Sequence, residues 1–61
     1  MQEEIIRVVD ECRANGVHFQ IVETKYEFGR HYVIMLNGVP GFHNTDLERV
    51  QDYMRNMAGM Q

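Results

Sequence analysis

The side chains best suited to binding a metal ion are one cysteine and three histidines, namely Cys12, His18, His31 and His43. Structural zinc sites usually contain at least one pair of ligands separated by about two to five residues, so that one turn holds both. No two of these four residues are that close. Cys12 and His18 also fall on different expected elements. The sequence therefore predicts neither a metal site nor a cofactor, and it places the three histidines on the surface or in loops.

Catalysis would need an activated nucleophile, and the candidates are Cys12, Thr24 and Thr45. None has an activating base close by in the sequence, although such bases can come from distant positions. The glycines match neither the phosphate-loop nor the dinucleotide pattern. A chain of 61 residues also has little material for a ligand cleft, which commonly takes about 300–1,000 Å³. We therefore expect no enzymatic activity, and an enzyme or small-ligand binder is the least favoured alternative.

The stretch Pro40, Gly41, Phe42 and His43 is the most unusual in composition. It lies shortly before an expected helix, and the free amides at a helix N-terminus can bind an anion. These four residues are therefore a candidate loop site. The alternative interpretation is that Phe42 fills the edge of the core while Pro40 and Gly41 turn the chain, since loop glycines and prolines usually serve turn geometry.

Charge and composition narrow the class of partner. The net charge is −3, and the six basic residues are scattered along the chain. A protein that binds nucleic acid usually carries a basic stripe, so nucleic acid is a disfavoured partner. The acidic N-terminus and the short apolar runs predict neither a secretory signal nor a membrane span. The single cysteine excludes a disulfide within the chain and is typical of a reducing compartment. We expect one domain, residues 1–61, in the cytoplasm.

The first segment, from about Gln2 to Asn15, has the apolar spacing of a helix. Ile5, Val8, Val9 and Cys12 stand at i, i+3, i+4 and i+7, which is one face of an α-helix. Asn15 and Gly16 follow as a helix stop, because glycine adopts the left-handed conformation without strain.

The middle of the chain alternates with a period of two, which predicts strands. The first runs from Val17 to about Lys25 and the second from His31 to Leu36. The Asn37-Gly38 pair that follows is a strong hairpin signal and predicts a short third strand near residues 39–42. Pro40 cannot donate a backbone hydrogen bond, so this strand should lie at a sheet edge.

A second helix is expected to begin at Thr45 or Asp46, with Thr45 as its N-cap in a capping box with Glu48. Gly59 is its expected stop. The predicted fold class is thus α+β, in the order helix, antiparallel meander of two long strands and a short third, helix, with both helices on one face of the sheet. The expected core consists of Ile5, Val8, Val9, Cys12, Phe19, Ile21, Ile34, Leu36, Leu47, Val50, Met54 and Met57.

The order helix, three strands, helix resembles that of the double-stranded-RNA-binding domain. This family has a lysine cluster at the start of its last helix, where the present chain has Asp46, Leu47, Glu48 and Arg49. Acidic side chains there would repel phosphates, so we assign no RNA-contacting residue. The resemblance concerns element order alone, and it makes a nucleic-acid-binding module the alternative function.

The second strand is apolar on both faces, and such strands are normally covered on both sides. If Ile34 faces the helices, then Val33 and Met35 face the opposite side, near Val22. We expect an interface there, formed by Val22, Tyr26, Val33 and Met35. The leading hypothesis is a small non-enzymatic protein-binding or regulatory module, such as a cellular or phage-encoded modulator or inhibitor. Its partner would be a second copy of the chain, as a homodimer, or another protein.

Overall fold

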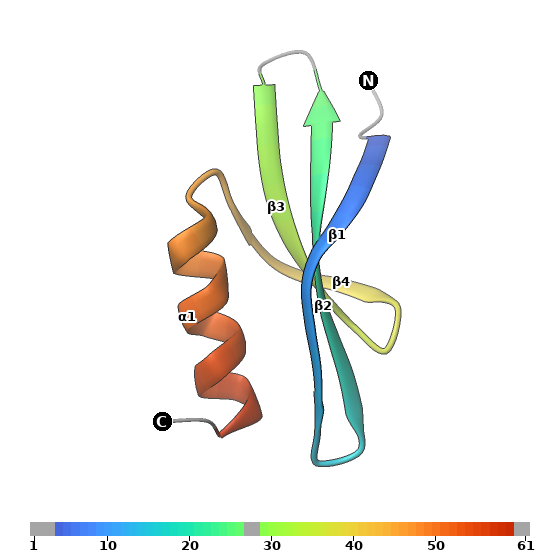
Figure 1. Cartoon of the computed structure of the whole chain (residues 1–61), viewed down its shortest axis with the longest axis vertical. Coiled ribbons are helices and arrows are strands. Elements are labelled where there is room, and N and C mark those ends of the chain that lie inside the picture. Colours follow the sequence, from blue (N-terminus) through green and yellow to red (C-terminus); the bar gives the residue numbers. More distant parts are fainter. Residues whose placement is uncertain (1–3, 27–28, 60–61) are drawn as a thin grey trace.

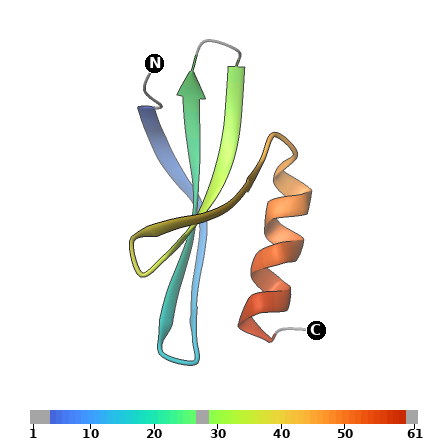
Figure 2. The same cartoon turned by 180° about the vertical axis from the view of Figure 1, so that it is seen from behind.

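The computed structural model describes residues 4–26 and 29–59, with the side chains of Glu4 and Tyr26 excepted. These residues form one four-stranded antiparallel sheet in the order β1-β2-β3-β4, followed by one helix that packs on one face of the sheet (Figures 1 and 2). The elements in chain order are β1 (Glu4–Ala14), β2 (Val17–Tyr26), β3 (Gly29–Leu36), β4 (Val39–Asn44) and α1 (Leu47–Ala58).

The expected first helix does not form, and the predicted fold class is wrong in this respect. Residues 4–14 are β1, which pairs with β2 along its whole length. The order is four strands and one helix, so the likeness to the double-stranded-RNA-binding domain in element order is also lost. The small α+β class remains correct.

The helical spacing in β1 arises from two irregularities in its pairing with β2. The register shifts between Ile5 and Arg7 and again between Val8 and Asp10, so that β1 carries an extra residue at each place. Each extra residue reverses the alternation of side chains between the two faces. As a result, Val9 and Cys12 pack against the core beneath the helix, whereas Ile5 lines the opposite face.

Both Asn-Gly pairs form hairpin turns. Asn15 and Gly16 have φ angles of 54° and 76°, and Asn37 and Gly38 have φ angles of 51° and 84°. Two consecutive positive φ angles are characteristic of the type I′ turn that joins antiparallel strands. The prediction for residues 37–38 is confirmed, and the prediction that residues 15–16 end a helix is wrong.

The strand β4 is an edge strand, as Pro40 predicted. It extends further than the expected residues 39–42, because it continues to Asn44. Residues 40–43 are therefore part of a strand and do not form a loop. The register with β3 shifts between Val33 and Met35, where β4 carries one extra residue.

Helix α1 begins one residue later than the predicted capping box implies. Asp46, rather than Thr45, is the N-cap, and its side chain accepts a hydrogen bond from the backbone N–H of Glu48 at 3.1 Å. Gly59 ends the helix in the left-handed conformation, as expected. No helix within residues 4–26 and 29–59 is long and apolar enough to cross a membrane.

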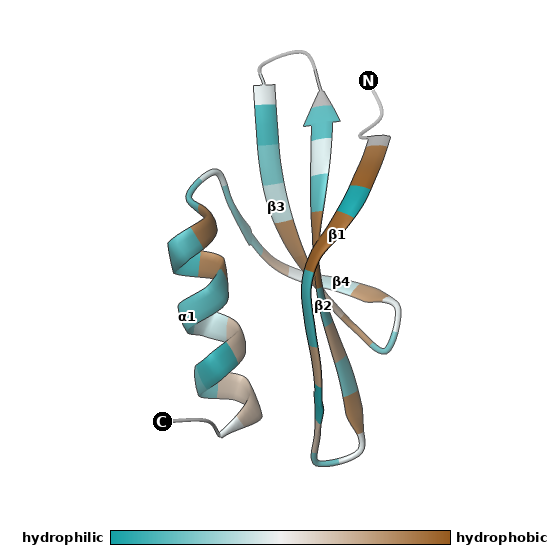
Figure 3. Cartoon of the chain, viewed as in Figure 1, coloured by the Kyte–Doolittle hydropathy of each residue, from teal (hydrophilic) through white to brown (hydrophobic). Residues whose placement is uncertain are grey.

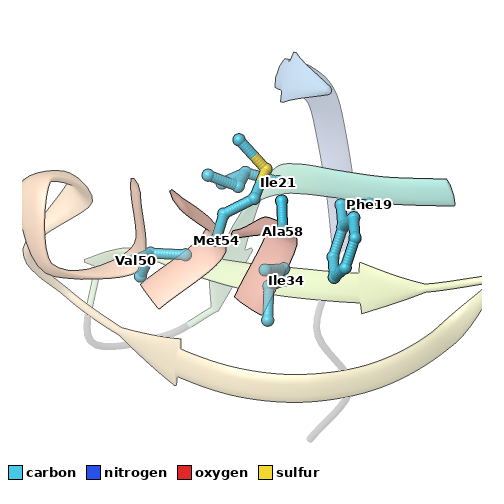
Figure 4. Packing of buried hydrophobic residues seen from close by; sticks show 6 residues of the cluster. All are labelled: Phe19, Ile21, Ile34, Val50, Met54 and Ala58. Carbon is cyan, nitrogen blue, oxygen red and sulfur yellow. The ribbon is translucent and has the colours of Figure 1, made fainter. Parts of the chain in front are cut away.

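The core lies between α1 and the adjoining face of the sheet (Figure 4). Its buried members, from β2, β3 and α1, are Phe19, Ile21, Ile34, Val50, Met54 and Ala58. Five of these were expected from the sequence. Three residues of the predicted core, Ile5, Val8 and Met57, are instead exposed, the first two because β1 is a strand.

Candidate functional site

The sheet face opposite α1, here called the open face, is the principal candidate site. Because side chains alternate along a strand, residues adjacent to Ile21 and Ile34 point away from the helix. Val22 and Val33 are such residues, and they are paired neighbours in the sheet. The open face contains a hollow of about 180 Å³, lined by Ile5, Val22, Thr24, Val33, Met35 and Pro40.

The hollow has a buried floor and an exposed apolar rim. Val22 and Val33 are already buried within the single chain and form the floor, and Met35 is half-buried beside them. Ile5 is 61% exposed and Val8, the cross-strand partner of Val22, is 46% exposed. In Figure 3 the N-terminal half of β1 is mostly brown, the colour of hydrophobic residues, with one hydrophilic band between. The rim therefore keeps the apolar side chains of Ile5 and Val8 in contact with water.

The expected interface residues Val22, Val33 and Met35 all lie at this hollow. The fourth, Tyr26, ends β2, and its side chain lies outside the described residues. Sequence reasoning missed Ile5 and Val8 as surface residues because it placed them in a helix. The β-branched side chains of this segment, together with the Asn-Gly pair that follows it, are the signal that favours a strand.

The candidate loop residues do not form one site, because β4 divides them between the two faces. Pro40 lines the hollow and His43 pairs with Val33, so both belong to the open face. Phe42 lies on the helix side, where its ring stacks on Tyr53 with centroids 4.5 Å apart. A Cβ atom on Gly41 would come within 2.8 Å of the Leu36 side chain on that same side.

The candidate nucleophiles show no activating geometry. Cys12 is half-buried and packs against the core, as a small hydrophobic residue would. The hydroxyl of Thr24 donates to the backbone carbonyl of His31 at 3.2 Å. Thr45 is exposed, just before the helix cap. None of the three hydroxyl or thiol groups is paired with a base in the hydrogen bonds of the described residues.

The most concentrated charge lies on the helix side, at Glu23. This carboxylate is buried, and it accepts from Arg7 Nε at 2.7 Å and pairs with Arg30 Nε at 3.3 Å. Both guanidinium groups are largely exposed to water. The three charges tie β1, β2 and β3 together, and this arrangement explains the burial of a carboxylate in so small a domain.

Two histidines meet on the open face beside the hollow. His31 Nε2 and His43 Nδ1 are 2.9 Å apart, and the two rings are nearly perpendicular. The sequence did not indicate this contact, because the two histidines are far apart in the chain. The pairing of β3 with β4 brings them together. Within residues 4–26 and 29–59, no group of three or more His, Cys, Asp or Glu side chains could hold a metal ion.

Comparison of the chain with models of protein families, with curated proteins and with solved structures found no match. Its function must therefore be argued from the open face and the side chains upon it.

Proposed function

We propose that the chain is a small protein-binding module that associates with a second copy of itself through the open face. The observation that carries this proposal is the exposure of two apolar side chains on this face, Ile5 at the hollow and Val8 beside its floor residue Val22. Burying apolar surface stabilises association by about 25 cal/mol per Å² before the costs of ordering are subtracted. Contiguous exposed apolar surface of this kind is typical of contact sites.

The charge distribution favours a second copy as the partner. Around the hollow, the open face carries the uncharged residues of β2 and β3, among them Gln20, Val22, Val33 and Met35. A face with a strong charge of one sign would repel its own copy. At the hairpin end, Glu11 and Arg13 carry opposite charges, so that a twofold arrangement can place unlike charges opposite each other.

The size of the chain points to the same conclusion. A domain near 60 residues buries only about 60% of the surface that its unfolded chain exposes, and oligomerisation commonly compensates for this deficit. A standard interface buries about 800 Å² per partner. This is roughly a fifth of the 4345 Å² of accessible surface, and one broad face of a molecule measuring 35 × 20 × 15 Å is of that order.

Analytical ultracentrifugation over micromolar to millimolar concentrations tests the proposal. We expect a dimer for the natural sequence and a monomer for Ile5→Asp, because the new carboxylate would be buried in the interface. Met35→Asp should act in the same direction. Val39→Asp is the matched control, since Val39 is 63% exposed and pairs with Leu36 of the helix side. A natural chain that stays monomeric throughout this range would refute the homodimer.

A further inference from the structure

The contact between His31 and His43 has the chemistry of a metal site. Neighbouring antiparallel strands bring the two imidazoles together on the open face, with His31 Nε2 and His43 Nδ1 separated by 2.9 Å. We propose that these two nitrogens bind a divalent transition-metal ion of the nickel and copper class. The pair adjoins the hollow, since His43 is the cross-strand partner of Val33, but both nitrogens come from one chain and their proximity does not require a second copy.

The nitrogens are close enough to share one ion, and their chemistry indicates which ions fit. Imidazole nitrogens lie about 2.0–2.1 Å from a bound metal ion. Two such ligands at a right angle are about 3 Å apart, close to the observed 2.9 Å. The same 2.9 Å is the length of the hydrogen bond that joins the two rings, so the rings must turn slightly before both lone pairs can converge on an ion. The preference for Cu(II) and Ni(II) rests on the ligand type, because imidazole suits these ions and Cu(II) binds nitrogen ligands most tightly among the divalent first-row metals.

The protons of the pair can be rearranged to allow binding. In the hydrogen bond between the rings, one of the two facing nitrogens carries a proton and the other accepts it. Coordination needs a lone pair on both. The proton of the donating ring therefore leaves this contact when an ion binds, and it passes either to another nitrogen of the pair or to solvent. Which nitrogen of a histidine binds a metal is set by the hydrogen bond that its other nitrogen makes.

One ring is fixed and the other is accessible. His31 is only 7% exposed, and its backbone carbonyl accepts the hydroxyl of Thr24. His43 is exposed on the edge strand, so an ion can enter from solvent, with water in the remaining positions. The neighbouring cation Arg30 has its Nε directed to Glu23 on the other face, which limits its repulsion of a bound ion.

Titration of the natural chain with Ni²⁺, followed by calorimetry and by ¹H–¹⁵N NMR, tests this site. We expect one ion per chain and selective paramagnetic broadening of the His31 and His43 ring signals. His43→Ala should lower the affinity at least tenfold. Because His43 is exposed, we expect His43→Ala to retain the fold, which circular dichroism checks. If His43→Ala does not fold, His43→Gln replaces it in the titration.

His18→Ala is the matched control, because His18 is the remaining histidine and lies near Glu11 at the hairpin end. It should bind Ni²⁺ as the natural chain does. The monomeric Ile5→Asp variant should also retain binding, which separates this proposal from the homodimer. Unchanged affinity in His43→Ala, or absence of binding in the natural chain, would overturn the assignment.

Discussion

Arg7 of β1 donates from Nε to Oε1 of Glu23 of β2 at 2.7 Å, and the two residues are direct partners in the sheet. The contact exists only because residues 4–14 form a strand. A helix over the same residues would not hold Arg7 in register with Glu23. The ion pair therefore marks the difference between the expected and the observed fold.

Replacement of the buried carboxylate should weaken the fold. Glu23→Gln retains the shape of the side chain but removes the charge that faces both Arg7 and Arg30. Because the guanidinium groups are exposed, solvent screening moderates the loss. We expect the free energy of unfolding to fall by about 1–2 kcal/mol, measured by urea denaturation.

The exposed pair of Arg55 and Asp52 provides the control for this measurement. Asp52→Asn should change the free energy of unfolding by about 0.5 kcal/mol or less, since exposed ion pairs contribute little. Equal effects of the two substitutions would show that the Glu23 cluster is not a stabilising feature.

The two Asn-Gly turns should respond differently to loss of the asparagine. Asn15 and Asn37 both have positive φ angles, so alanine is strained at either position. Asn37 has an additional role, because its Oδ1 accepts from the backbone N–H of His18 at 2.9 Å. We expect Asn37→Ala to cost about 1 kcal/mol more than Asn15→Ala in denaturant unfolding. Equal costs would show that the contact with His18 adds nothing.

The stacked rings of Phe42 and Tyr53 couple β4 to α1. Their planes are within 10° of parallel, and aromatic pairs contribute about 0.5–1.5 kcal/mol beyond the area that they bury. A double-mutant cycle of Phe42→Leu and Tyr53→Leu should therefore give a coupling energy near 1 kcal/mol in thermal or urea unfolding. Additive effects of the two substitutions would contradict direct coupling.

Several local features of the fold could be read from the sequence. The turn at Asn37-Gly38 and the helix end at Gly59 were predictable because a positive φ angle favours glycine or asparagine, whatever surrounds them. The edge position of β4 followed from Pro40, which lacks a donor for a further strand. The inward faces of β2 and β3 followed from simple periodicity, and that of α1 followed except at its end, where Ala58 is buried and Met57 is exposed.

The candidate site was only partly predictable. Alternation along β3 placed Val33 and Met35 on the face away from Ile34, and both line the hollow. The exposed rim could not be found in this way, because Ile5 and Val8 match the spacing of a helix as well as that of an irregular strand. Local patterns do not distinguish these cases when extra residues change the phase of the alternation.

The sequence by itself determined the turn at Asn37-Gly38, the edge strand and the inward faces of β2 and β3, because these depend on backbone conformation and on short-range periodicity. The tertiary structure alone decided that residues 4–14 are a strand and that His31 meets His43. Both depend on pairing with another strand, and the register of such pairing is set by contacts between distant segments. The open face, with its apolar hollow and its pair of histidines, is formed by this pairing between strands.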